Sequence, residues 1–215
     1  MCKVYVVGVG PGDPEILTIK GARIISTAEV VVGWSSVVER FRDIVGREAK
    51  IRILTYRNQL QELDRALHEG SKIAVLDHGD PSVSDFQFLE RIREVSTSHG
   101  CEVEVVPGVS SINYVLARAN LDLSSAIFVT MHVRADESEL FKELVHVLRC
   151  GRRLVVLPPP DERGVSRVAS VLLEHVGDRE VIIMERLSYP DEKVVRGKLS
   201  SFLNYVNTDL VAMVI

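Results

Sequence analysis

The sequence predicts an α/β protein with two α/β domains, residues 1–119 and 120–215. Apolar runs alternate with helical patterns along the whole chain, which is typical of strands joined by helical crossovers. Three glycine-containing loops follow apolar strands in the first domain, and a Pro190-Asp191-Glu192 turn separates two extended segments in the second. We therefore expect a mainly parallel N-terminal sheet and a mixed C-terminal sheet with antiparallel pairs.

The first domain is expected to contain five strands, each followed by a helix. The strands are expected near residues 3–9, 29–33, 50–54, 72–77 and 102–106. The helices are expected near residues 14–27, 35–46, 58–69, 85–98 and 110–119. Five strands with their crossovers form a complete sheet, so this half of the chain is expected to fold as one domain.

The second domain is expected to begin after Asn120-Leu121-Asp122, where the pattern changes. Its strands are expected near residues 125–132, 152–157, 179–186 and 210–215, and its helices near residues 137–149 and 164–176. A proline cluster, Pro158-Pro159-Pro160, follows the second of these strands. Three consecutive prolines force an extended backbone without amide donors, so this segment presents carbonyl oxygens and ring surface.

Composition and charge exclude several classes of protein. The apolar fraction of 46% with 26% charged residues is ordinary for a soluble globular protein. No apolar run approaches the roughly 20 residues of a membrane span, so we expect a cytoplasmic protein without a membrane segment. A net charge of −4 gives no general attraction to nucleic acid or to anionic lipid.

The cysteines and most of the histidines predict no special chemistry. Cys2, Cys101 and Cys150 lie far apart, without a CxxC pair or a histidine at zinc-ligand spacing, so neither a disulfide framework nor a metal site is expected. We interpret these cysteines as packing residues. Four histidines fall late in the expected helices or just past them, where the helix dipole and solvent exposure explain them: His68, His99, His146 and His175.

The first glycine loop ends the segment Lys3–Asp13, KVYVVGVGPGD, which places bare backbone at the carboxyl end of a strand. Ligands of open α/β folds bind at this edge of the sheet. The dinucleotide fingerprint requires a glycine where this chain has Asp13, Pro11 removes one amide, and no Lys-Ser or Lys-Thr pair follows. The loop therefore suits a neutral or cationic ligand better than an anion. The alternative is a tight turn without a ligand.

Two further loops have the same position relative to a strand. Asp77-His78-Gly79-Asp80-Pro81 follows an apolar strand, and Asp80 either accepts hydrogen bonds from a ligand or caps the next helix. Pro107-Gly108-Val109-Ser110-Ser111 also lies between a strand and a helix. Ser110 or Ser111 is a plausible N-cap, which is compatible with a ligand contact because the amides of the first helical turn are free.

Taken together, these loops resemble the tetrapyrrole (corrin and porphyrin) methylase family of S-adenosylmethionine enzymes. The resemblance covers essentially the whole chain through VGVGPGD, HGDP, PGVSS and ERLSYPDEK. Two longer segments, PGVSSINYVLARANLDLSSAIFVTMH and ERLSYPDEKVVRGKLSSF, are similar to the family members that methylate C5 of cobalt-precorrin-7 in cobalamin (vitamin B12) synthesis. The resemblance implies an S-adenosylmethionine-dependent C-methyltransferase with its active site in a cleft between two domains. It also implies a homodimer and a separate C15-methylating, decarboxylating partner.

Two alternatives stay open at this point. One is a methylase of the same fold that acts on another precorrin position or on a diphthine-type protein side chain. The other is a binding subunit that has lost its catalytic activity, an alternative that the unusual DHGDPSVSD loop keeps open.

The resemblance also implies which residues form the site. The cofactor-binding residues would be Gly10, Asp80, Val83, Ser110, Ser111, Thr130, Met131, Leu157 and Pro158. A sulfonium cofactor suits an aspartate, carbonyl groups and apolar surface. Methyl transfer depends mainly on alignment of donor and acceptor, so no nucleophilic triad is required.

A base can assist by removing a proton from the substrate, and Asp13, His78 and His132 are candidates, with a structural role as the alternative for each. The catalytic residues expected first are Asp13 and His132, and the substrate-binding residues are Pro11, His78 and Arg134. Arginines near strand ends or loops are candidates for the substrate carboxylates: Arg57, Arg134, Arg152, Arg153 and Arg186.

Overall fold

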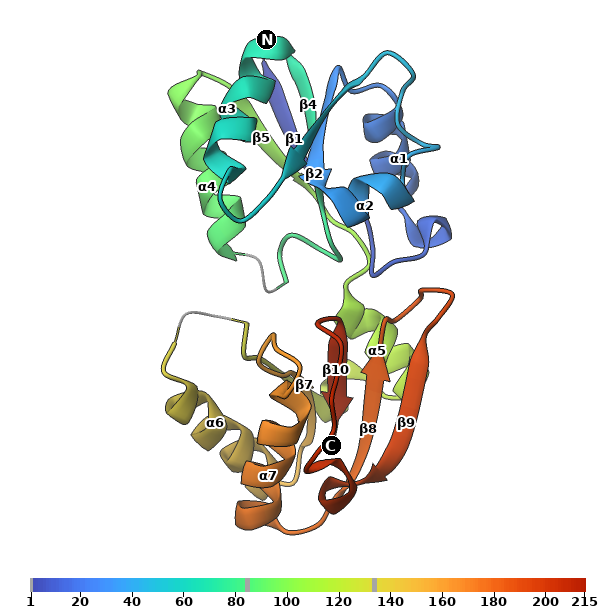
Figure 1. Cartoon of the computed structure of the whole chain (residues 1–215), viewed down its shortest axis with the longest axis vertical. Helices are drawn as coiled ribbons and strands as arrows, with labels where there is room; N and C mark the ends of the chain where they lie inside the picture. Colours follow the sequence, from blue (N-terminus) through green and yellow to red (C-terminus); the bar gives the residue numbers. More distant parts are fainter. Residues whose placement is uncertain (1, 84–85, 133–134) are drawn as a thin grey trace. The chain divides into compact units, whose positions relative to one another are not determined.

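Two five-stranded sheets form the framework of the protein, as the computed structural model shows for residues 2–83, 86–132 and 135–215 (Figure 1). The chain divides into two units, Met1–Ser111 and Ile112–Ile215. The boundary expected from the sequence, between residues 119 and 120, lies at the other end of helix α5 (Ser111–Ala119). The expected fold class, two α/β domains with one parallel and one mixed sheet, is confirmed.

The sheet of the first unit is parallel throughout and has the strand order β3-β2-β4-β1-β5. Its strands are β1 (Lys3–Gly8), β2 (Val30–Trp34), β3 (Lys50–Leu54), β4 (Lys72–Asp77) and β5 (Glu102–Val106). Near the end of β1, Val7 pairs with Leu76 of β4 and with Val106 of β5. The carboxyl ends of these three strands therefore meet at one edge of the sheet.

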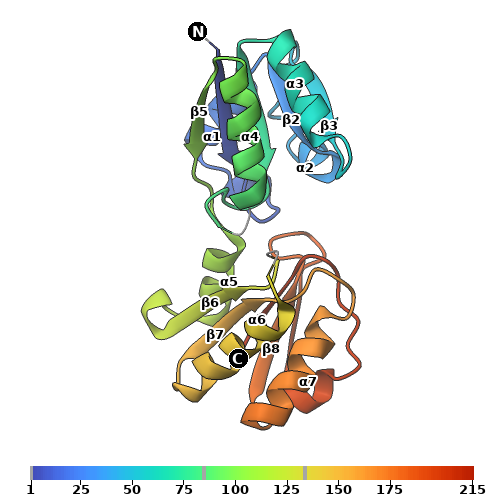
Figure 2. The same ribbon diagram turned by 90° about the vertical axis from the view of Figure 1, so that its left-hand side faces the viewer.

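Helices cover both faces of this sheet (Figure 2). They are α1 (Ile19–Ser26), α2 (Ser35–Arg40), α3 (Gln59–Glu69) and α4 (Phe86–Ser98). Val4 and Val6 pack in the core with Leu63 of α3, whereas Val7 packs in a second core with Ile24 of α1. Alternate residues of a strand point to opposite faces, so β1 has to be apolar on both.

The expected helix over residues 14–27 is wrong, because the chain contains two helix starts within it. A 3₁₀ helix, η1 (Pro14–Ile16), begins where Asp13 accepts a hydrogen bond from the backbone N of Glu15 at 2.9 Å. The backbone is then extended until Thr18, whose hydroxyl accepts a hydrogen bond from the backbone N of Gly21 at 3.0 Å. Each cap starts its own helix.

The prediction for the cysteines is also wrong, because Cys2 and Cys101 form a disulfide. Both residues directly precede neighbouring parallel strands, in which Lys3 pairs with Glu102, so their Cα atoms lie 4.7 Å apart. The strand order thus brings together two cysteines that are 99 residues apart in sequence. Cys150 is free but exposed, so it is not a packing residue either.

The sheet of the second unit is mixed and has the strand order β6-β7-β10-β8-β9. Its strands are β6 (Ala126–Thr130), β7 (Arg153–Leu157), β8 (Glu180–Glu185), β9 (Lys193–Lys198) and β10 (Val211–Val214). β6 and β7 pair in parallel, β10 pairs antiparallel with both β7 and β8, and the expected turn at Pro190-Asp191-Glu192 joins the antiparallel pair β8 and β9.

One core joins this sheet to its helices, α6 (Glu137–Arg149) and α7 (Gly164–Val176). Leu148 of α6 and Leu172 of α7 pack there with Met213 of β10. The unit also contains the 3₁₀ helices η2 (Leu123–Ser125) and η3 (Leu199–Phe202). Across the described parts of both units, every helix is too short or too polar to cross a lipid bilayer.

Candidate functional site

Three glycines bring the loops after β1, β4 and β5 into direct backbone contact. A Cβ atom on Gly8 would lie 2.6 Å from the N of Gly108 and 2.8 Å from the O of Gly79. A Cβ atom on Gly108 would lie 2.5 Å from the carbonyl oxygens of both Gly79 and Gly8. Only glycine allows backbones to approach this closely. We call Gly8, Gly79 and Gly108 the glycine cluster.

A backbone bridge fixes the first loop to the second. Gly10 donates to the carbonyl of Gly79 at 3.1 Å and accepts from the N of Gly79 at 2.9 Å. Both glycines have a positive φ, +87° for Gly10 and +75° for Gly79, which L side chains rarely adopt. The amide and carbonyl of Gly10 are therefore used between loops, so its role in cofactor binding would be to shape the loop.

Asp80 joins the second loop to the third. Its Oδ1 accepts a hydrogen bond from the N of Ser82 at 2.7 Å, and its Oδ2 accepts one from the N of Gly108 at 3.1 Å. The backbone carbonyl of Asp80 accepts from the N of Val83 at 2.9 Å. Neither sequence-based interpretation of Asp80, ligand contact or helix cap, includes this contact between loops.

The other expected residues of the first unit lie around the same three loops. Ser110 is buried, and Ser111 begins α5, with its backbone N 3.8 Å from the position of a Cβ on Gly79. Asp13 is half-buried and uses Oδ1 to start η1. Pro11 is buried and His78 is half-buried in the first and second loops. Arg134 lies outside the residues that the structure describes.

A second group of expected residues lies where β6 and β7 end. The parallel register pairs Thr130 with Leu157, so both strands end at the same edge of their sheet. Met131 donates a backbone hydrogen bond to the carbonyl of Leu157 at 2.9 Å, and the backbone N of His132 donates to the hydroxyl of Thr130 at 3.2 Å. We call Thr130, Met131, His132, Leu157 and Pro158 the strand-end group.

His132 is oriented by the carbonyl of Pro158. Its Nε2 lies 2.8 Å from that oxygen, and because a carbonyl can only accept, Nε2 carries the proton and donates. Desolvation lowers the pKa of His132, and the hydrogen bond to Pro158 opposes this effect only in part. The neutral ring is therefore favoured, with a lone pair on Nδ1 that can accept a proton.

Gly164 and Asn207 position the proline segment, and neither was expected from the sequence. A Cβ on Gly164 would lie 2.2 Å from the carbonyl of Pro159. The side chain of buried Asn207 donates to the carbonyl of Asp161 at 2.9 Å and accepts from the backbone N of Val165 at 3.0 Å. A glycine at the start of the helix that follows the proline cluster is a signal for this close approach, whereas Asn207 is too distant in sequence to give one.

Two of the arginines suggested for substrate carboxylates have partners within their own unit. Nε of Arg186 lies 2.6 Å from Oδ2 of Asp191, and its guanidinium stacks over the ring of Tyr189 at 4.5 Å from the centroid. Arg152 donates to the backbone carbonyl of Ser124 at 2.5 Å. Both guanidinium groups therefore already serve to hold loops.

Comparison with known proteins gives a match over nearly the whole chain. The model of the family Tetrapyrrole (Corrin/Porphyrin) Methylases matches residues 3–203. The chain is 31% identical to a cobalt-precorrin-4 C(11)-methyltransferase of Methanocaldococcus jannaschii, over 96% of this chain and 83% of that protein. It is 26% identical to a probable cobalt-precorrin-7 C(5)-methyltransferase of the same organism, over 94% of this chain and 92% of that protein.

A solved structure extends the comparison to three dimensions. The uroporphyrin-III C-methyltransferase of Thermus thermophilus, solved in complex with S-adenosyl homocysteine, matches with a TM-score of 0.75. The two proteins are 27% identical, and the match covers 99% of this chain and 91% of that one.

Proposed function

Because the chain belongs to the tetrapyrrole (corrin/porphyrin) methylase family, we propose that it transfers a methyl group to C5 of cobalt-precorrin-7 in cobalamin biosynthesis. The activity shared by the family, without a choice of substrate position, is that of an S-adenosylmethionine-dependent methyltransferase of precorrins or other tetrapyrroles, in cobalamin or siroheme biosynthesis. The observation that carries the choice of C5 is the similarity to the probable C5 enzyme over nearly the full length of both proteins.

The polar groups of the expected cofactor-binding residues fit S-adenosylmethionine. When it is bound, this cofactor supplies a methyl group that is activated on a sulfonium. A cation of this kind is stabilised by a carboxylate and by carbonyl groups. Asp80 and the amide-free proline segment contain such groups, which also accept hydrogen bonds within the protein. We propose the following residues for cofactor binding, as the family resemblance implies: Gly10, Asp80, Val83, Ser110, Ser111, Thr130, Met131, Leu157 and Pro158.

His132 is the better of the two proposed bases. Its Nδ1 lone pair is available in the neutral ring, and desolvation keeps its pKa low enough for that form to dominate at neutral pH. Asp13 already uses one carboxylate oxygen to start η1. We propose that His132 takes the proton that the substrate loses on methylation, while Pro11, His78 and Arg134 contact the substrate.

Methylation of C11 of cobalt-precorrin-4 is a second candidate function. The observation that favours it is the higher identity to the C11 enzyme than to the probable C5 enzyme. The two reactions use the same cofactor and similar macrocycles, so the glycine cluster and the strand-end group suit both.

Incubation of the enzyme with S-adenosylmethionine and each substrate in turn separates the two functions. We expect a mass gain of one methyl group with cobalt-precorrin-7, placed at C5 by NMR with a ¹³C-labelled methyl donor, and no gain with cobalt-precorrin-4. A gain with cobalt-precorrin-4 alone would establish the C11 function instead.

Calorimetry with S-adenosylmethionine tests the alternative that the chain is a binding subunit without catalytic activity. Binding of S-adenosylmethionine is expected, and no binding at millimolar cofactor would support a loss of catalytic function. Light scattering on the same preparation tests the homodimer, which we include in the proposal.

A further inference from the structure

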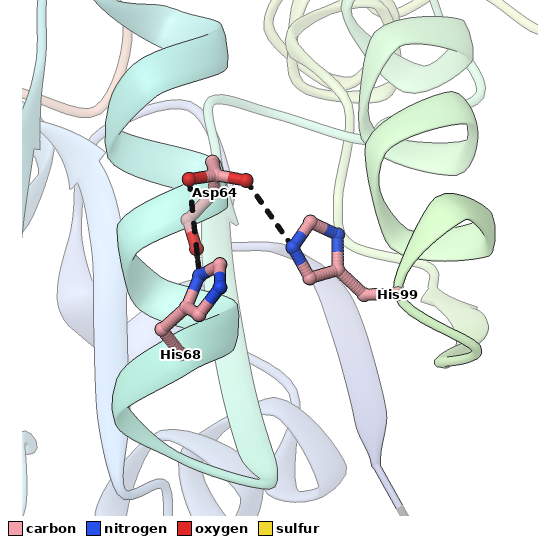
Figure 3. A group of neighbouring side chains, drawn as sticks. All are labelled: Asp64, His68 and His99. Carbon is pink, nitrogen blue, oxygen red and sulfur yellow. Dashed lines mark hydrogen bonds and ion pairs between the residues drawn. The ribbon is translucent and has the colours of Figure 1, made fainter.

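Asp64, His68 and His99 gather at one end of the first unit, although the sequence suggests no connection between them (Figure 3). Asp64 and His68 are one turn apart on α3, and His99 directly follows α4. One possible ligand atom from each residue lies within 4.8 Å of those of the other two. We propose that these three side chains form a binding site for a divalent first-row transition-metal ion, Zn²⁺ or the chemically similar Co²⁺ or Ni²⁺.

The two imidazole rings are held as metal-binding histidines usually are. Nδ1 of His68 lies 2.9 Å from the carbonyl of Asp64, and Nδ1 of His99 lies 3.0 Å from the carbonyl of Val95. A carbonyl only accepts, so each Nδ1 carries a proton and donates it. In the neutral rings the lone pair is then on Nε2, and a backbone contact that fixes the tautomer in this way is typical of metal-binding histidines.

Ser98 supports the same tautomer of His99. Its hydroxyl donates to the carbonyl of Val95 at 2.8 Å and lies 3.2 Å from Nδ1 of His99. Because the hydroxyl proton is used on Val95, the serine oxygen can only accept from His99. Two acceptors therefore hold the proton on Nδ1.

The contact between His99 and Asp64 indicates that a cation belongs here. Nε2 of His99 lies 3.2 Å from Oδ1 of Asp64, so the nitrogen that is unprotonated in the neutral ring lies next to a carboxylate oxygen. Two acceptors at this distance repel each other unless a proton or a metal ion lies near both. A second proton on His99 would give an ion pair, and a metal ion would give a coordination site.

The donor set selects the class of metal. Two imidazole nitrogens and one carboxylate oxygen suit zinc, cobalt and nickel, whereas Mg²⁺ and Ca²⁺ prefer oxygen ligands alone. Around one zinc ion, bonded about 2.0–2.2 Å away, ligand atoms lie roughly 3–4 Å apart, so small side-chain rotations complete the site. Asp64 and His68 are more than half exposed, which leaves room for water ligands.

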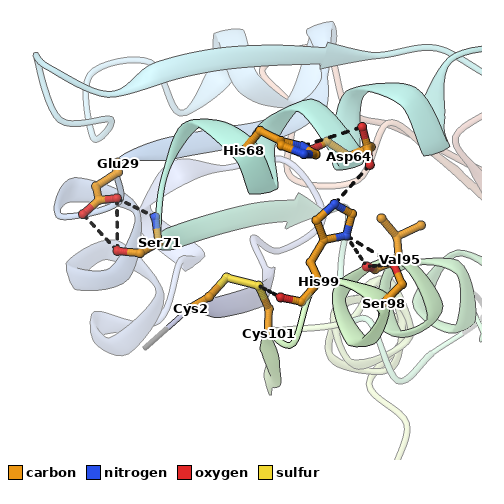
Figure 4. The surroundings of a disulfide bond; sticks show 9 residues. All are labelled: Cys2, Glu29, Asp64, His68, Ser71, Val95, Ser98, His99 and Cys101. Carbon is orange, nitrogen blue, oxygen red and sulfur yellow. Dashed lines mark hydrogen bonds and ion pairs between the residues drawn. A yellow bond between two sulfur atoms is a disulfide. The ribbon is translucent and has the colours of Figure 1, made fainter.

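The position of the site indicates a stabilising role. His68 and His99 lie just before the amino ends of β4 and β5, whereas the glycine cluster lies at their carboxyl ends. The Cys2–Cys101 disulfide lies beside His99, with Sγ of Cys101 3.8 Å from the carbonyl of His99 (Figure 4). A metal ion bound here would clamp α3 to α4 next to this covalent link, away from the methyl-transfer residues.

Titration of the full-length, untagged protein with Co²⁺, followed by visible absorption, and with Zn²⁺ in competition, tests the proposal. All proteins in the test carry Cys150→Ser, because Sγ of Cys150 lies 3.6 Å from Nε2 of His146 and this pair could bind the same ions. We expect one saturable site per chain, and His68→Ala, His99→Ala and Asp64→Asn each to weaken it by about tenfold or more. A free Zn²⁺ concentration about a hundred times its Kd is expected to raise the Tm of the protein by about 5 °C.

His175→Ala is the matched control. Nδ1 of His175 lies 2.9 Å from the carbonyl of Val171, four residues earlier on α7, so its ring has the same local contact as His68 and His99. This variant is expected to keep the affinity of the parent. Circular dichroism confirms that each variant is folded, and Asp64→Asn tests the site with almost no change in shape.

Three results would overturn the proposal. They are binding weaker than about 1 mM, unchanged affinity in both His68→Ala and His99→Ala, and an equal loss of affinity in His175→Ala. Any of them would leave a surface contact between His99 and Asp64, without a metal ion, as the explanation of the cluster.

Discussion

The glycine cluster and the strand-end group lie at the carboxyl ends of strands in their own sheets, yet they are built in opposite ways. In the first, backbone atoms of three loops occupy the space that a Cβ on Gly8 or Gly108 would need. In the second, side chains act, with Thr130 accepting from His132 and His132 donating to Pro158. Substitutions in the glycine cluster are therefore expected to change the folding of the loops. Substitutions in the strand-end group are expected to change the chemistry of the site while the protein stays folded.

The largest effect is expected from a methyl group in the glycine cluster. Gly108→Ala would place Cβ 2.5 Å from two carbonyl oxygens that belong to packed backbone, so the loops have to separate. We expect the free energy of unfolding to fall by at least about 3 kcal/mol, measured by urea denaturation.

Gly100→Ala is the comparison variant, in which backbone strain and not a close contact is the expected cost. Gly100 has a φ of +66°, and beyond its own chain neighbours no described heavy atom lies within 4 Å of its Cβ position. This substitution should cost only about 1–2 kcal/mol. Equal costs for the two variants would show that the close backbone contacts at Gly108 can be relieved at no more cost than the strain at an uncrowded glycine.

The disulfide extends the comparison to the two units, since the first contains Cys2–Cys101 and the second contains the free Cys150. Replacement of both Cys2 and Cys101 by alanine removes a link that closes a long loop. We expect a loss of about 2–5 kcal/mol, seen as a lower urea midpoint. Cys150 is exposed, so Cys150→Ser should change the free energy of unfolding by less than about 0.5 kcal/mol. A reducing agent should have no effect on the stability of the double variant.

His132→Gln tests the side-chain character of the strand-end group. The glutamine amide can still donate to the carbonyl of Pro158, so stability should change by less than about 1 kcal/mol. If His132 is the base, kcat should fall by about 100-fold or more. A variant that is fully active would exclude His132 as the base, and one that unfolds would show a structural role.

The pH dependence gives an independent test of His132. Desolvation lowers its pKa below the usual value near 6.5, so the active neutral ring persists at lower pH than in a free histidine. kcat/KM should therefore rise with pH through a midpoint below 6.5, and the Gln variant should lack this step. The unfolded chain binds this proton more tightly, so His132 lowers stability as the pH falls below about 6.5 and has no such effect above it.

The sequence predicts the order of strands and helices well, because periodicity and turn residues are local signals. It also predicts that Asp80 and His132 lie at strand ends. It does not predict the pairing of Cys2 with Cys101, because neither residue reveals that β1 and β5 are neighbours. The same limit applies to the approach of His99 to Asp64, which depends on the packing of α4 against α3.

Asp80 combines features of the glycine cluster and the strand-end group, because its side chain supports a cluster made of backbone atoms. Asp80→Asn keeps an oxygen for the N of Ser82 but turns an NH₂ group toward the N of Gly108, where a carboxylate oxygen now accepts at 3.1 Å. Asp122→Asn is a matched control, since Asp122 makes the same turn with the N of Ser124 at 2.8 Å. We expect Asp80→Asn to cost about 1–2 kcal/mol more than Asp122→Asn in urea denaturation, which is the contribution of the hydrogen bond between loops. Equal costs would mean that the hydrogen bond from Gly108 to Asp80 contributes nothing measurable, and that the glycines alone hold the second and third loops together.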